Sequence, residues 1–105
     1  MTPKAKKWRS RTKEDYAAIF EAVRCVVHQM DPYGLLAQGC PADEFDTEIK
    51  VIVRQIDKIN SPQDATFLIS RVLSHYFSAD KFPPEECQEA GVELHRVLKE
   101  RNLLL

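Results

Sequence analysis

The chain has 105 residues, 44% hydrophobic and 30% charged, with a net charge of −1, a composition typical of one soluble globular domain. Its three cysteines are an odd number, which argues against a disulfide framework and favours a reducing cytoplasm. No apolar stretch is long enough for a secretory signal or a membrane span, so we expect a cytoplasmic protein with no membrane contact.

Residues 1–12 are predicted to form a flexible basic arm ahead of a domain at residues 13–105. The first thirteen residues carry +6 with no acid, whereas the other 92 hold nine basic and sixteen acidic side chains, a sum of −7. The arm fits a solubilising tail, a contact with an acidic protein surface, or nucleic-acid binding through phosphates and a stacked Trp8. The arm residues concerned are Lys4, Lys6, Lys7, Trp8, Arg9 and Arg11.

The first helix is predicted over residues 13–30. Thr12 suits the N-cap, and Glu14 and Asp15 place negative charge in the first turn, where the helix dipole favours it. Apolar residues recur from Tyr16 to Met30 at spacings of three and four, which is typical of a helix with one buried face. This helix is therefore expected to lie at the centre of the core.

A loop over residues 31–40 follows, because the proline ring at position 32 excludes a helical residue before it. The second helix is predicted at about 42–59, where apolar residues from Phe45 to Ile59 alternate in spacings of four and three. A β-strand is the competing interpretation, because Ile49, Val51 and Val53 alternate and are β-branched. The helical pattern accounts for six apolar residues and the alternating pattern for three, which favours the helix.

Two further helices are predicted, at about 62–77 and 84–101, each beginning with a proline in its first turn. Gly91 lies inside the last helix, where glycine costs about 1 kcal/mol relative to alanine, so a neighbouring helix is expected to approach closely there. The leucines at 103–105 are expected to fold back onto the core or to meet a partner. The sequence thus predicts an all-α, single compact four-helix domain.

Two segments carry a resemblance to a known family. Asp31-Pro32-Tyr33-Gly34-Leu35-Leu36 is followed after four residues by an acidic segment from Pro41 to Ile49, and Glu85-Glu86-Cys87 comes late in the chain. Together they resemble the signature of a small bacterial all-α domain family of unknown function. The resemblance covers most of residues 16–100 and implies a small helical bundle, but no activity.

The acidic cluster Asp43, Glu44, Asp46 and Glu48 is the first candidate site. Spacings of three and four place pairs of its carboxylates on shared faces of a helix. Three interpretations stay open: helix capping with a solvated face, a patch that binds a partner, and a Mg²⁺ or Ca²⁺ site, although no EF-hand pattern is present. Tyr33 lies in the adjoining loop and is assigned to the same surface.

Cysteine and histidine chemistry is the weaker candidate. Cys25, His28 and Glu21 share a helical face and could contribute to a zinc site, but no fourth ligand is evident. Nucleophilic catalysis by Cys40 or Cys87 would need a histidine within hydrogen-bond reach, and no spacing supplies one. We therefore predict no enzyme activity, no cofactor and no metal.

The predicted function is a non-catalytic protein-interaction module that uses an acidic surface, in the manner of an immunity protein or antitoxin whose carboxylates block a basic active site. Its predicted contact residues are Tyr33, Asp43, Glu44, Asp46 and Glu48. The alternative is a nucleic-acid-binding protein that contacts phosphates through the basic arm.

Overall fold

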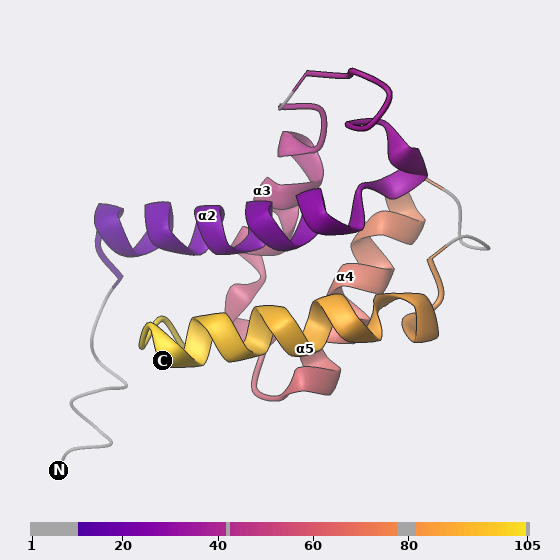
Figure 1. Cartoon of the computed structure of the whole chain (residues 1–105). Helices are drawn as coiled ribbons and strands as arrows, with labels where there is room; N and C mark the ends of the chain where they lie inside the picture. Colours follow the sequence, from indigo (N-terminus) through magenta and orange to yellow (C-terminus); the bar gives the residue numbers. More distant parts are fainter. Residues whose placement is uncertain (1–10, 42, 78–81, 105) are drawn as a thin grey trace, which may run out of the picture.

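A computed structural model describes residues 11–41, 43–77 and 82–104, and it contains helices and no strand over those residues (Figure 1). The all-α, four-helix prediction is therefore confirmed. The basic residues predicted at positions 4–9 lie outside the described residues. In chain order the elements are α2 (Lys13–Met30), the 3₁₀ turn η1 (Pro32–Gly34), α3 (Asp46–Arg54), η2 (Ile56–Lys58), α4 (Pro62–Tyr76) and α5 (Pro84–Glu100).

Helix α2 begins and ends where the sequence predicts. The Thr12 side chain accepts a hydrogen bond from the Asp15 backbone N–H, and the Asp15 carboxylate accepts one from the Thr12 N–H, a reciprocal capping box. At the other end Asp31 adopts a left-handed conformation with φ 45°. Its carboxylate accepts hydrogen bonds from the backbone N–H groups of Leu36 and Ala37, which stabilises the following loop.

The second predicted helix, 42–59, is shorter in the structure. Residues 43–45 form a turn, α3 ends at Arg54, and η2 follows as a separate 3₁₀ segment. The predicted start at residue 42 is wrong. Asp43 and Glu44 lie in the turn, and the helix begins only at Asp46, after Phe45, whose side chain makes no capping hydrogen bond. The apolar face nevertheless persists through the break, since Phe45, Ile49, Ile52, Ile56 and Ile59 are all buried.

Helices α4 and α5 form the closest pair in the fold. Gly91 of α5 faces the backbone of Thr66 in α4, and a Cβ at that position would lie 2.6 Å from the Thr66 Cα. The expectation of close helix approach at Gly91 is thus confirmed. Before α5, the Phe82 carbonyl accepts hydrogen bonds from the hydroxyls of Ser70 and Ser74, which fixes the chain entering the helix.

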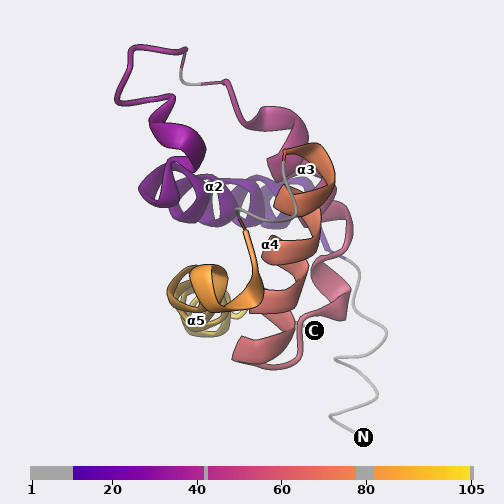
Figure 2. The same cartoon turned by 90° about the vertical axis from the view of Figure 1, so that its right-hand side faces the viewer.

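The helices make two layers. Helices α2 and α5 run side by side in opposite directions, and α3 and α4 lie behind them (Figures 1 and 2). At one end the Arg11 guanidinium, only 3% exposed, bonds to Asp57 of η2 and to the Leu103 carbonyl. Leu103 is itself buried, so this residue folds back onto the core.

Candidate functional site

The predicted acidic cluster is only partly brought together on the surface. Asp43 and Glu44 are exposed in the turn before α3, and Asp46 is half-buried at its first position. Glu48 points inward instead and is 8% exposed. Tyr33 has its backbone in η1, and its side chain lies outside the described residues. The structure therefore leaves Asp43, Glu44 and Asp46 as the surface part of this site.

Glu48 is buried because it stands on the apolar face of α3, three residues after Phe45 and four before Ile52. Its Oε1 atom has no hydrogen-bond partner among the described residues. The same is true of Nε2 of His28, whose ring lies edge-on to Phe45 at 6.5 Å between centroids. The Glu48 carboxylate is therefore not part of the acidic contact surface that the sequence predicts.

The basic arm is described only at its last predicted members. Arg11 belongs to the domain, because its guanidinium is occupied by Asp57 and the Leu103 carbonyl. Thr12 caps α2 and is equally part of the domain. For the preceding cations and Trp8 the role of the arm, including nucleic-acid binding, stays a prediction.

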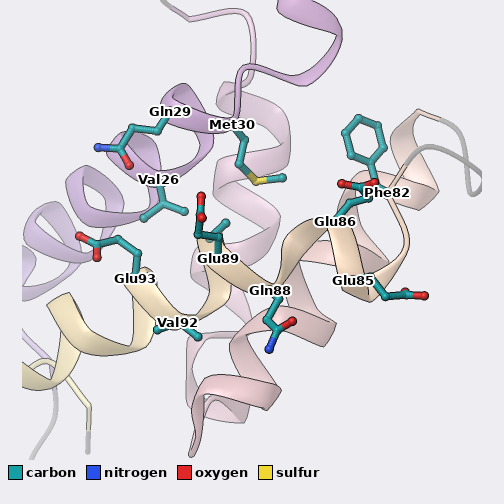
Figure 3. A pocket seen from close by; sticks show the side chains of 11 residues that line it. Val26, Gln29, Met30, Phe82, Glu85, Glu86, Gln88, Glu89, Val92 and Glu93 are labelled. Carbon is teal, nitrogen blue, oxygen red and sulfur yellow. The ribbon is translucent and has the colours of Figure 1, made fainter.

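A groove between α2 and α5 encloses a cavity of about 900 Å³ (Figure 3). We call it the α2/α5 groove. Its four carboxylates come from the first three turns of α5, and its apolar surface comes from both helices and from a residue two positions before α5. The carboxylates are Glu85, Glu86, Glu89 and Glu93, and the apolar residues are Val26, Met30, Phe82, Ala90 and Val92.

The carboxylates of the groove differ in their partners. Glu93 accepts hydrogen bonds from Arg96 at 2.6 and 3.1 Å, and these bonds hold the pKa of Glu93 below its usual range. Glu85, Glu86 and Glu89 are exposed and have no ion pair within the described parts of the chain. We call these three residues the acidic triad. The groove therefore presents three carboxylates that no cation of the described residues pairs with.

The positions of the carboxylates are visible in Figure 3. Glu89 and Glu93 point from α5 toward the side of α2 that carries Val26 and Gln29. Glu86 lies beside Phe82 near the start of α5, and Glu85 stands at the outer border. The arrangement places an apolar floor between carboxylates, which is the surface expected to bind a segment carrying both cations and apolar side chains.

An apolar hollow adjoins this groove, with a cavity of about 280 Å³ between the first turns of α4 and α5. Pro62, Phe67, Pro84 and Val92 contribute its apolar surface. Phe67 is 57% exposed and Val92 is 47% exposed, which is unusual for such large apolar side chains. Since Val92 also lines the α2/α5 groove, the two hollows meet along α5.

The three cysteines are unpaired and differ in burial. Cys87 is fully buried, and burial, aided by the negative charge of Glu86, raises its pKa to about 11. Cys25 is exposed on α2 and Cys40 is half-buried in the loop. Over residues 11–41, 43–77 and 82–104, no three His, Cys, Asp or Glu side chains are grouped closely enough to hold a metal ion.

None of the helices in the described part of the chain has the length and apolar character needed to cross a membrane. Comparisons with protein-family models, with curated proteins and with solved structures find no match to the chain. The resemblance to the small bacterial domain family therefore stays a prediction.

The groove was not predicted from the sequence, although one signal for it is present. Glu85, Glu86, Glu89 and Glu93 recur at spacings of three and four, which places them along one side of a helix. At the start of a helix, acids are also favoured by the dipole, and this explanation accounts for Glu85 and Glu86 without any partner. Only the packing of α2 against α5 shows that these carboxylates border an apolar floor.

Proposed function

We propose that this protein is a non-catalytic interaction module that binds a basic, partly apolar segment of a partner protein in the α2/α5 groove. The observation that carries the proposal is the acidic triad beside the apolar residues of the groove, with no cation among the described residues that line it. Uncompensated carboxylates favour and steer a cationic partner, while the apolar floor supplies the burial that holds it.

The dimensions of the groove favour a short helical segment. From Glu85 to Glu93 the carboxylates extend over eight positions of α5, or about 12 Å, which equals roughly two helical turns. A basic amphipathic helix lying there would place its apolar face against Val26, Met30 and Ala90 and its cations against the triad.

Within this class we propose an immunity- or antitoxin-like inhibitor acting in the cytoplasm. A nuclease presents a basic surface to its substrate, and an acidic surface is the complement of such a surface. The exposed Asp43 and Glu44 lie outside the groove, at the turn before α3, where they would contact another part of a whole partner protein and not a short peptide bound in the groove. This assignment is an analogy of charge and size.

The proposal is tested with a fluorescein-labelled cationic peptide that carries leucines at helical spacing, titrated with the full chain and followed by anisotropy. Neutralising the acidic triad (E85Q/E86Q/E89Q) should weaken binding roughly tenfold, at about 0.5 kcal/mol for each exposed carboxylate. The matched control D43N/E44Q also removes exposed acids, but outside the groove, and should bind as the wild type does. Circular dichroism checks that both variants fold.

Equal affinity of the triad variant and the wild type would overturn the proposal. So would a loss of binding in D43N/E44Q with the triad variant unaffected, because the site would then be the turn before α3.

A further inference from the structure

We infer that the segment bound in the α2/α5 groove carries a carboxylate beyond its cations, and that this carboxylate pairs with Arg101 at the end of α5. The inference rests on the proposed function, since it adds a second contact to the same bound segment. It states the chemistry of the partner more closely, as a helix with basic residues in one half and an acidic residue in the other.

The α2/α5 groove continues along the two helices into a second hollow, with a cavity of about 330 Å³. Val26, Gln29 and Glu93 line both cavities, so the two adjoin along the line where α2 and α5 pack. Arg101 also lines the second cavity, eight positions after Glu93. We call this cavity the Arg101 hollow. Its place shows that a segment lying in the groove can extend toward the C-terminal end of α5.

The charged side chains that line the Arg101 hollow differ in their partners. The Glu21 carboxylate pairs with Arg24 at 3.2 Å, and the Glu93 carboxylate pairs with Arg96 at 2.6 Å. The Arg101 guanidinium has no ion pair and no hydrogen bond within the parts of the chain that the structure describes. Along α5 the unpaired charge therefore changes sign, from negative at the acidic triad to positive at Arg101.

The separation of these charges sets the length of the bound segment. Arg101 follows Glu89 by twelve positions and Glu85 by sixteen, which is about 18 to 24 Å along the helix axis. A helix lying along α5 needs roughly 12 to 16 residues, or three to four turns, to reach from the triad to Arg101. The two turns that contact the groove are thus one half of a longer segment.

The change of sign favours a segment with separated charges over a uniformly basic one. A cation placed at Arg101 would meet a like charge, whereas a carboxylate there meets an unpaired opposite charge. The same carboxylate placed near the acidic triad would be repelled. At about 18 Å from Glu89 this repulsion is largely screened, because the screening length is about 8 Å at physiological ionic strength.

The experiment compares two fluorescein-labelled helical peptides with identical cations and leucines. They differ at one residue, placed twelve positions beyond the basic half, which is glutamate in one peptide and glutamine in the other. Each is titrated by anisotropy with the full-length wild type and with Arg101→Gln. The matched control is Lys99→Gln, which removes an exposed cation that lines neither cavity. Circular dichroism checks that both variants fold.

We expect Arg101→Gln to weaken binding of the glutamate peptide about twofold to threefold more than binding of the glutamine peptide, as for one exposed ion pair. Lys99→Gln should change the affinity of both peptides by the same factor. This double-mutant cycle isolates the pairing of Arg101 with the carboxylate from the general effect of removing a positive charge.

Cys25 gives a second readout, because its exposed thiol lines the Arg101 hollow. At saturation the glutamate peptide should slow alkylation of Cys25 by N-ethylmaleimide severalfold, as measured by mass spectrometry. Cys40 is half-buried in the loop outside both cavities, and it should react as in the free protein.

Three results would overturn the inference: equal effects of Arg101→Gln on the two peptides, the same preference for the glutamate peptide lost in Lys99→Gln, or Cys25 alkylation unchanged at saturation. The triad variant E85Q/E86Q/E89Q separates the two proposals. If it weakens binding of the glutamine peptide while Arg101 shows no coupling to the carboxylate, the inference fails and the proposed function stands. If the wild type binds neither peptide, both fail.

Discussion

Burial gives the cysteine side chains of this protein different chemistry. Cys87 is buried at the start of α5, and its pKa is raised from 9.0 to about 11, whereas Cys25 is exposed on α2. The thiolate is the reactive form, so at neutral pH Cys87 should resist alkylation until the domain unfolds. The cysteine count could be read from the sequence, but this difference could not, because it depends on which helix covers each thiol.

The raised pKa of Cys87 predicts a loss of stability at high pH. Below about pH 9 the thiol is protonated in both the folded and the unfolded chain and adds no pH dependence. Between about 9 and 11 the unfolded chain releases the proton first, so the free energy of unfolding falls as pH rises through this window.

Urea unfolding of the wild type and Cys87→Ala at several pH values checks this prediction. The alanine variant should lack the part of the decline that belongs to the thiol, and other titrating groups are common to both proteins. Parallel curves for the two proteins from pH 8 to about 11 would contradict it.

The burial of Glu48 was not predicted from the acidic segment in which this residue lies. An acid within an acidic segment was assigned to the surface, yet its position between Phe45 and Ile52 on the helix turns it inward. Its Oε1 atom lacks a hydrogen-bond partner in the described chain, and a buried polar atom in that state is destabilising by about 1–3 kcal/mol.

Replacing this carboxylate with an apolar side chain of similar length should therefore stabilise the domain. We expect Glu48→Met to raise the free energy of unfolding by about 1 kcal/mol, measured by urea denaturation. A control substitution of the exposed Glu44 by methionine should change it by less than about 0.5 kcal/mol. A clear loss of stability in Glu48→Met would show that the carboxylate is satisfied in solution.

At the scale of the element, periodicity predicted helix positions well and helix starts less well. The bounds of α2, α4 and α5 lie within one residue of prediction, since each has a recognisable first turn, with Thr12, Ser61 or a proline. The helix predicted at 42–59 begins only at Asp46 and divides into α3 and η2. Neither its start nor its break could be predicted from the apolar spacing, because that spacing continues unchanged through both.

The close packing of α4 against α5 requires a glycine at position 91, because a Cβ there would collide with Thr66. Alanine would favour the helix by about 1 kcal/mol, but its Cβ would lie 2.5 Å from the backbone nitrogen of Thr66. Because that atom is backbone, α4 and α5 would have to separate. We expect Gly91→Ala to lower the free energy of unfolding by about 1–3 kcal/mol, as in other overpacked sites.

Thermal unfolding checks this expectation, with Gln88→Ala on the exposed side of α5 as the control. Thr66→Ala should rescue Gly91→Ala only partly, because it removes the hydroxyl but leaves the backbone contacts. An unchanged or increased melting temperature for Gly91→Ala alone would show that the helices approach less closely than described.

At the scale of the whole molecule, the candidate site depends on packing. Residues 14–105 carry a net charge of −7, and acids are concentrated around the start of α3. Both features predict an acidic contact surface. Three of those predicted acids remain exposed or half-exposed there. The α2/α5 groove joins residues some sixty positions apart, Val26 with Glu89 for example, and no spacing along one helix encodes that pairing.

Nuclear magnetic resonance of the ¹⁵N-labelled full chain, titrated with the cationic amphipathic peptide, locates the binding surface most directly. Binding in the groove predicts amide shift changes concentrated at residues 85–93 of α5 and 26–30 of α2, with little change at 43–46. Changes confined to residues 43–46, or spread evenly over every exposed acid, would contradict a docking surface between α2 and α5.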